Sequence, residues 1–301
     1  MNSIQLASQF VPMLDEVYKN SSLSAVLDGA PELVKAGANA NELVIPKMSM
    51  NGLGDYSRSN GGYLTGDVTL TNETVACNFD RGRMFDVDVM DDIETAGIAF
   101  GRLASEFIRT KVVPELDAFR FATYASASGI SKIDSGASLE TGAAVVAALR
   151  VAVSKFDEDE VPLEERYLFI TPTLLGLVQD MDTTKSREVL ANFAAIIKVP
   201  QTRFYTKIKQ LKGKIVTPAG GGDPVDETAG GYTKASDGKN INFLVIHKPA
   251  CIQFEKHVAP KIITPEQNQT ADGYKFGYRN IGICDVYDNK VAGVYLHFQG
   301  E

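Results

Sequence analysis

Two stretches of alternating residues constrain the fold of this chain more than any other feature. Glu42–Met50 alternates like a β-strand, and Thr74–Val89 does so again after a loop dense in glycine, asparagine and serine. In the second stretch Phe79 and Phe85 share one face with arginines, and aspartates occupy the other face. Little nearby sequence could pack against such a hairpin, and an isolated pair of strands is barely stable in water. We therefore expect something outside the chain to cover it.

A long helix is predicted to follow the hairpin. Apolar residues recur at spacings of three or four after Asp91, and the acids that crowd the first turn suit the positive end of a helix. Pro114 should kink this helix, because proline lacks the amide hydrogen that the preceding turn needs. Helical spacing then resumes from Glu115 to Tyr124. The whole helix spans about 35 residues, whereas a typical globular helix has roughly 11–12.

The rest of the chain mixes helices and strands, so the predicted fold class is α+β. Thr171-Pro172 is a helix start signal, because threonine caps well and proline fits the first helical position. The other expected elements are a helix at Leu139–Lys155, a buried strand at Glu164–Ile170, extended chain at Val199–Ile208, a strand at Asn242–His257 and two closing strands in Tyr274–His297 that are separated near Asp288-Asn289. Thr217–Asn240 is rich in glycine and should form an exposed loop.

The charge balance argues against a protein that grips nucleic acid. The formal net charge is −8 in 301 residues, whereas phosphate binding needs clustered lysine and arginine. An acidic wall that merely encloses DNA is compatible with this charge. Nothing in the sequence resembles a signal peptide or a membrane span, so we expect a chain made in the cytosol.

The usual catalytic and cofactor motifs are missing from the sequence. It holds no GxxxxGK[ST] phosphate loop, no GxSxG nucleophile turn and no HExxH zinc motif. Gly52-Leu53-Gly54 lacks the third glycine of a dinucleotide site, and Asp86-Val87-Asp88 lacks the ligands of a calcium loop. We therefore predict no enzyme activity, no cofactor and no metal. The glycine-rich loop could serve as an enzyme lid, although it has no partner residues for catalysis.

The remaining candidates for chemistry have simpler structural interpretations. The number of cysteines is odd and no two of them are closely spaced, so we interpret them as small hydrophobic residues. The histidines read as polar residues at strand ends, since none has an evident catalytic partner. The acidic run 157–160 reads as a solvated helix end and not as a metal site. The three cysteines are Cys77, Cys251 and Cys284, and the histidines are His247, His257 and His297.

Several segments, in order along nearly the whole chain, resemble tailed-bacteriophage major capsid proteins. The segment within the long helix is Val113-Pro114-Glu115-Leu116-Asp117-Ala118-Phe119-Arg120-Phe121. Later segments that carry the resemblance are 199–205 (VPQTRFY), 242–250 (NFLVIHKPA), 272–274 (DGY), 278–279 (YR) and 289–295 (NKVAGVY). Each segment alone is a weak signal, but the ordered set is fairly specific.

The resemblance implies the capsid fold that lambdoid phages share with encapsulins and the herpesvirus shell floor. In that fold an N-terminal arm and an extended β-hairpin loop precede a peripheral domain with a long spine helix, and an axial domain meets its copies at the capsomer centre. The implied division is an arm at 1–41, the extended loop at 42–90, the peripheral domain with its spine at 91–135, the axial domain at 136–256, and strands that return to the peripheral domain at 257–301.

The resemblance also implies contacts between subunits. The tip of the extended loop should reach a neighbouring subunit through Asp55, Tyr56 and Arg58, and Phe79 and Phe85 should pack on a neighbour's spine helix. For Asp55 and Arg58 the alternative is a solvated turn that contributes nothing. An exposed ion pair contributes only about 0–1 kcal/mol.

The expected function is therefore a structural one. Copies of the chain should form hexamers and pentamers of an icosahedral shell, the virion capsid, around double-stranded DNA that is not bound sequence-specifically. Assembly should occur in the cytoplasm of a bacterial host, with a portal. Ninety residues precede Asp91, too few for a built-in scaffolding region, so the scaffold should be a separate protein or absent. The alternatives are an encapsulin-type compartment with cargo enzymes and, more remotely, an enzyme with an unrecognised site.

Overall fold

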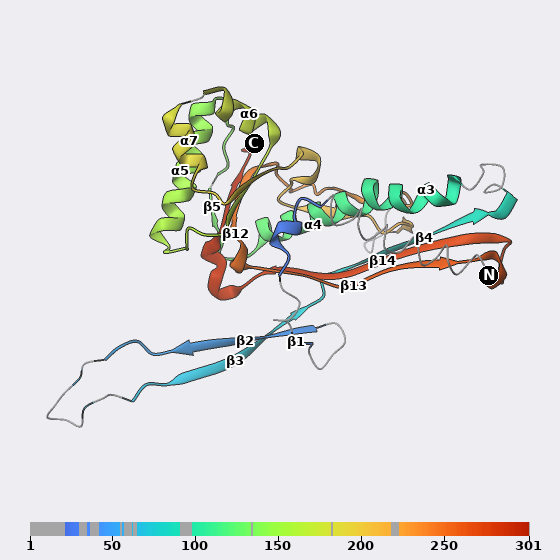
Figure 1. The fold of residues 1–301 in the computed structure, drawn as a ribbon, viewed down its shortest axis with the longest axis horizontal. Coiled ribbons are helices and arrows are strands. Elements are labelled where there is room, and N and C mark those ends of the chain that lie inside the picture. Colours follow the sequence, from blue (N-terminus) through green and yellow to red (C-terminus); the bar gives the residue numbers. More distant parts are fainter. Residues whose placement is uncertain are drawn as a thin grey trace.

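The long helix lies against a long three-stranded sheet, and together they form what we call the peripheral unit (Figure 1). The computed structural model describes residues 22–29, 35–36, 42–54, 56, 62, 65–90, 98–133, 135–181, 183–217 and 223–300. The sheet is antiparallel in the order β13-β14-β4. Its strands are β13 (Cys251–Ile263), β14 (Gly273–Val286) and β4 (Phe79–Asp88).

The spine helix has three parts: α3 (Ile98–Phe107), the π-helical turn η3 (Ile108–Val112) and α4 (Val113–Ser126). The expected irregularity at Pro114 takes the form of this π turn, in which the amide of Val113 bonds to the carbonyl of Ile108. Pro114 itself lies in the first turn of α4, where a missing amide hydrogen costs little. The helical spacing predicted from Glu115 to Tyr124 is confirmed, because both residues lie in α4, and the predicted start at Asp91 lies outside the described residues.

The peripheral core forms where the apolar face of the sheet meets the spine. Phe79 of β4 lies 5.0 Å, centroid to centroid, from Phe119 of α4, and Phe85 lies 4.8 Å from Phe107 of α3. Phe276 of β14 is fully buried in the same cluster. The alternation predicted for β4 is therefore confirmed, with its aromatic face inside and its aspartates exposed.

The second unit, which we call the axial unit, is a five-stranded sheet in the order β5-β15-β12-β6-β7 with helices beside it (Figure 1). The strands are β5 (Ser131–Lys132), β15 (Val294–Phe298), β12 (Ile241–His247), β6 (Arg166–Ile170) and β7 (Ala195–Lys198). The helices are α5 (Gly142–Glu158), α6 (Pro172–Met181) and α7 (Thr184–Leu190). The predicted helix start at Thr171-Pro172 is confirmed.

Apolar side chains fill both faces of the axial sheet. On one face the helices bring Val145, Leu149 and Phe156 against Leu168 of β6. On the other face, Phe121 of the spine contacts Phe169 and Phe204 with ring centroids 5.1 and 5.2 Å apart. The spine therefore belongs to the cores of both units.

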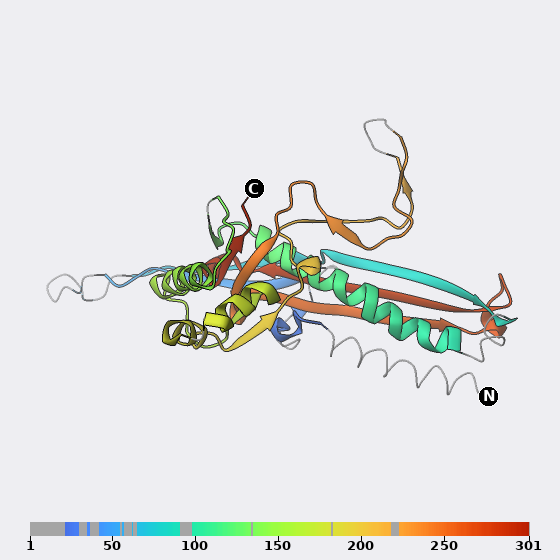
Figure 2. The same ribbon diagram turned by 90° about the horizontal axis from the view of Figure 1, so that it is seen from above.

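Two segments project from these units. One is the hairpin of β2 (Glu42–Met50) and β3 (Val68–Ala76), with the short β1 (Lys35–Ala36) along its edge. The other, residues 208–234, we call the overhanging loop, and Figure 2 shows it standing out from the rest of the chain. Its strands are β8 (Ile208–Gln210), β9 (Ile215–Val216), β10 (Val225–Asp226) and β11 (Tyr232–Lys234). The remaining elements are short turns: η1 (Ala25–Leu27), η4 (Gln201–Arg203), η5 (Lys248–Ala250), η6 (Pro265–Gln267) and η7 (Asp288–Gly293).

Three of the sequence-based boundaries differ from the structure. The extended loop ends at Ala76 and not at residue 90, because β4 leaves the hairpin and pairs with β14. The strand predicted at 242–257 is two strands, since the turn η5 with Pro249 separates β12 from β13. The closing segment 257–301 serves both units, because β15 joins the axial sheet between β5 and β12. The division between β14 and β15 near Asp288 is confirmed.

Candidate intersubunit surfaces

The β2–β3 hairpin carries an apolar face that is exposed in the single chain. The register places Met48 opposite Leu70 and Met50 opposite Val68, so the four side chains share one face. Between 56 and 67 % of each side chain is exposed. We call this set the apolar ladder. Exposed apolar clusters of this kind mark interaction surfaces.

The opposite face and the base of the hairpin are different in character. Ser49 lies opposite Thr69, so the second face is polar. At the base, Val75 is buried against Ile252 and Ile283 on the outer side of the peripheral sheet. The ammonium group of Lys47 also lies 3.3 Å from a carboxylate oxygen of Asp288. The hairpin, which projects from the rest of the chain (Figure 1), is thus held at its base and at Lys47, while the apolar ladder stays exposed.

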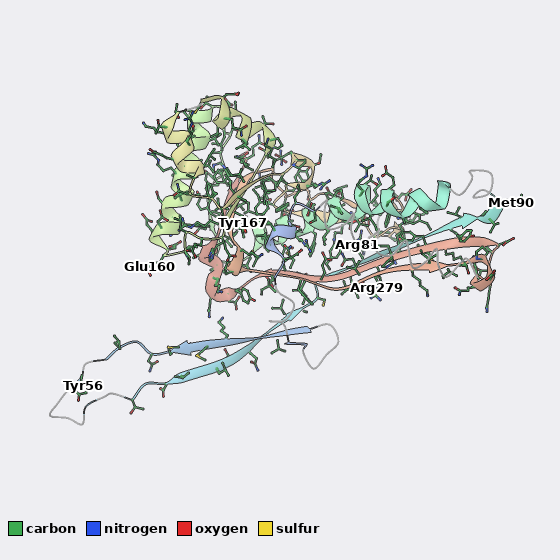
Figure 3. The ribbon with its side chains drawn as sticks, in the orientation of Figure 1. Tyr56, Arg81, Met90, Glu160, Tyr167 and Arg279 are labelled. Carbon is green, nitrogen blue, oxygen red and sulfur yellow. The ribbon has the colours of Figure 1, made fainter. Side chains whose placement is uncertain are left out.

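Of the three residues predicted to contact a neighbour at the tip of the hairpin, the structure describes Tyr56. Tyr56 is 59 % exposed, and Figure 3 shows it far from both units at the end of the hairpin. Leu53 beside it is fully exposed. Asp55 and Arg58 lie outside the described residues.

The placement of Phe79 and Phe85 corrects the sequence-based expectation. Both rings pack against the spine helix of their own chain, so they need no neighbour to cover them. The side-chain amide of Asn78 explains the change of sheet, because it donates to the carbonyl of Cys284 and accepts from the amide of that residue. These bonds pin the chain to β14 between the hairpin and β4. Alternation alone does not reveal which strand will be the partner.

A groove of about 920 Å³ lies between the spine helix, β4 and the overhanging loop. Arg81 holds the loop in place, since its guanidinium donates to the carbonyls of Leu211 and Gly231 and lies 2.7 Å from Glu115. Arg83 donates to the carbonyl of Thr228. Burial raises the pKa of Glu115, and Arg81 opposes that effect. The two arginines, predicted only as part of an alternating strand, thus shape this groove.

The N-terminal segment 22–29 is held on the spine by the buried carboxylate of Asp117. This side chain is fully buried and accepts hydrogen bonds from the hydroxyls of Ser22 and Ser24 and from the amide of Leu23. Arg203 of the axial unit donates to it as well, at 3.2 Å. Donors from two segments distant in sequence therefore satisfy one buried charge, as a buried carboxylate requires.

Arg120, one turn further along the spine, extends this network to β13. Its guanidinium, with a side chain 3 % exposed, donates to Ser24 and to Glu255. Gln253 of β13 donates to the carbonyl of Ser24 and accepts from the hydroxyl of Tyr124. The arm is thus attached by a specific polar network at 22–29.

Two cysteines and one histidine are poor candidates for catalysis. Burial raises the pKa of Cys284 to about 12 and that of Cys251 well above its usual value, so both thiols stay protonated. Burial lowers the pKa of His297 to about 4, and its Nδ1 lies 3.1 Å from the side-chain nitrogen of Asn242. Within the described ranges, no three potential metal-ligating side chains come together. Over the same part of the chain, no helix combines the length and apolar character needed to cross a membrane.

Comparisons with known proteins identify the fold. No family model matches the chain, and no curated protein matches its sequence. Among solved structures, "Mycobacterium phage Che8" has a TM-score of 0.57 at 11% identity, over 86% of this chain and 85% of that one. The capsid of Staphylococcus phage Andhra has a TM-score of 0.56 at 11% identity, over 92% and 86%. A virus-like particle from Pyrococcus furiosus has a TM-score of 0.54 at 9% identity, over 94% and 95%. The chain therefore has the α+β fold of phage capsid structures.

Proposed function

We propose that this chain is the major capsid protein of a tailed bacteriophage, and that it is not an enzyme. Copies of it form the hexamers and pentamers of an icosahedral shell around double-stranded DNA. The observation that carries this proposal is the apolar ladder, which stands on a projecting hairpin and is exposed in the single chain. A protein that works alone has no need of such a surface. The capsid fold supplies the context in which a neighbouring copy covers it.

The energetics suit a lattice. Burying one methionine, leucine or valine side chain contributes about 1.5–3 kcal/mol. A ladder of four such side chains against a neighbour therefore contributes several kcal/mol, which is modest for one contact. A closed shell repeats the contact at every subunit, so many weak contacts act together. The surface that we expect to receive the hairpin is the spine side of the adjacent subunit.

The charge and the fold support the other partners that we propose. The shell encloses DNA without sequence-specific binding, in keeping with the net charge of −8. A portal takes part in assembly, with a separate scaffold protein or without one. Assembly takes place in the cytoplasm of the bacterial host, and its product is the virion.

An encapsulin-type compartment is the second candidate. The likeness to a virus-like particle covers 94% of this chain and 95% of that one, as fully as the likeness to phage capsids. Purified particles distinguish the two: nuclease-protected double-stranded DNA indicates a phage shell, and enclosed enzymes indicate a compartment. An enzyme would instead show substrate turnover by a monodisperse monomer.

The hairpin provides the test. We expect the variant Met50→Ser with Leu70→Ser to stay folded, because the cores of both units lie elsewhere, and to lose normal shells in negative-stain micrographs. The matched control, Ser49→Ala with Thr69→Ala, alters the polar face of the same strands and should assemble. Replacing Asn51–Gly62 by a short Gly-Ser turn should also abolish normal particles. Normal shells from the ladder variant, or a wild-type chain that stays monomeric in native mass spectrometry with and without scaffold, would contradict the proposal.

A further inference from the structure

A turn after α5 gathers acidic side chains into what we call the acidic corner, residues 157–165. Its carboxylates belong to Asp157, Glu158, Asp159, Glu160, Glu164 and Glu165. Among the residues that the structure describes, two cations pair with them, Lys155 with Asp159 and Arg166 with Asp157. The guanidinium of Arg166 lies beneath the turn and also donates to the carbonyls of Val161 and Pro162. The corner is therefore a fixed, negatively charged protrusion.

The groove beneath the overhanging loop has the opposite charge. Five of its lining side chains are positive, namely Arg81, Arg83, Lys111, Lys212 and Lys234. Two are negative, Glu106 and Glu115, so the lining has an excess of three positive charges in a chain whose net charge is −8. Glu115 is already paired with Arg81, and Glu106 with Arg109. Lys212 is exposed at the rim.

The two surfaces lie far apart in the molecule. In Figure 3 Glu160 lies at the outer edge of the axial unit, on the side toward which the hairpin extends, and Arg81 lies near the middle of the molecule, beneath the spine. A protrusion and an oppositely charged recess that lie so far apart cannot meet within one copy. They can meet between copies in a head-to-tail contact, and such contacts generate rings when the rotation closes.

We propose that the acidic corner of one subunit docks at the basic groove of the next copy, as the electrostatic contact that orders subunits around a capsomer. The inference rests on the proposed function, since it requires that copies associate. The hairpin projects from the same side as the acidic corner, so both face the same neighbour. Complementary charges of this kind raise the association rate and fix the register. The recess is wide enough for a turn of several residues, at about 920 Å³.

Charge reversal tests the contact. The groove variant is Lys212→Glu with Lys234→Glu, and the corner variant is Glu158→Lys with Glu164→Lys. At about 50 mM salt we expect each to assemble at least about tenfold more slowly than wild type in light scattering, because steering by complementary charge changes association rates by roughly 10–10³. The four changes together should recover most of the rate. At about 1 M salt the differences should shrink, because the screening length falls to about 3 Å.

Matched controls separate this contact from a general effect of charge. Lys132→Glu with Lys185→Glu makes the same change in net charge as the groove variant, at exposed positions of β5 and α7. Asp180→Lys with Glu188→Lys makes the same change in net charge as the corner variant, again at exposed positions. Both controls should assemble at the wild-type rate. Equal slowing by a control and its matched variant, or no recovery in the combined variant, overturns the inference.

Cross-linking identifies the occupant of the groove directly. In rings assembled from a mixture of light and ¹⁵N-labelled chains, a zero-length carbodiimide should join Lys212 or Lys234 to the acidic corner of a differently labelled copy. Links within one copy only, links to residues 1–21, or protection of the groove lysines by DNA overturn the inference. If wild type forms normal shells and the charge-reversed variants assemble at the wild-type rate, only this inference fails. If wild type forms no rings or shells at all, the proposed function fails with it.

Discussion

The carboxylate of Asp117 accepts a hydrogen bond of 2.7 Å from the hydroxyl of Ser24, although 93 residues separate the two in sequence. Asp117 is fully buried in α4 of the spine helix, and Ser24 belongs to the attached segment 22–29 of the arm. The bond therefore joins the arm to the helix that both units share. It also explains why a charged residue occupies a buried position of this helix.

We expect Asp117→Ala to lower the free energy of unfolding by about 3–5 kcal/mol, because it leaves Arg203 and the amide of Leu23 without their acceptor. Amide hydrogen exchange in residues 23–27 should accelerate, which shows release of the arm. The control Asp180→Asn, at an exposed end of α6, should change stability by no more than about 0.5 kcal/mol. An unchanged exchange rate in the arm would show that other contacts hold it.

Two glycines in neighbouring helices should respond in opposite directions to substitution by alanine. A Cβ at Gly142 would lie 2.3 Å from the carbonyl oxygen of Leu177, so α5 and α6 would have to separate, and we expect a loss of at least about 1–3 kcal/mol. A Cβ at Gly176 meets nothing within 4 Å. Gly176→Ala should therefore stabilise the protein by about 0.4–1 kcal/mol. Chemical denaturation of the two variants measures both effects.

His297 should make stability fall between about pH 6.5 and pH 4. Burial lowers the pKa of His297 to about 4 in the folded state, while an unfolded histidine titrates near its ordinary value of about 6.5. Within that window the unfolded chain binds a proton that the folded chain does not, so stability is full above the window and declines as the pH falls through it. The loss at pH 4 should reach about 3 kcal/mol.

The contact between His297 and Asn242 also makes stability fall as the pH falls. The nitrogen of Asn242 donates to the carbonyl of Ala137 and lies 3.1 Å from Nδ1 of His297, where a neutral ring can accept. A protonated ring would bring two donors together. In His297→Gln the slope of unfolding free energy against pH should flatten over this window. An unchanged slope would assign the pH dependence to carboxylates elsewhere.

The three thiols should react at different rates in the folded protein. Cys77 is partly exposed, whereas Cys251 and Cys284 are buried with raised pKa values. At about pH 8 iodoacetamide should label Cys77 first and all three only after unfolding, as peptide mass spectrometry can show. Replacing all three by serine should leave the assembled morphology unchanged and reduce stability, since two buried sites then hide a hydroxyl. Loss of shells by a folded triple variant would reveal a functional thiol.

Local signals in the sequence predicted several elements correctly. The cap at Thr171-Pro172 and the break between the closing strands near Asp288 each depend on residues that are adjacent in the chain. The ordered resemblance predicted the capsid fold. The exposed glycine-rich region was also predicted, although the projection begins earlier, at Ile208.

The errors concern pairing between distant segments. The alternation of β4 predicts which face of the strand is buried but not which strand pairs with it. The change of sheet depends on Asn78, which forms hydrogen bonds with Cys284, 206 residues away in sequence. The sequence contains a weak signal of the polar network around Asp117. Asp117 and Arg120 are spaced by three on a face whose neighbours, Leu116 and Phe121, are buried. Charged residues at buried helical positions predict partners, but not where in the chain those partners lie.

The last strand of the axial sheet has a consequence for protein synthesis. β15 lies between β5 and β12, its first four residues are buried, and the ribosome makes it after the other described strands of this sheet. A nascent chain that has not reached Val294 has a gap in the middle of this sheet. Such a chain cannot complete the axial unit, so products that terminate before Val294 should fail to fold it. Folding of this sheet therefore waits for the strand that is made last.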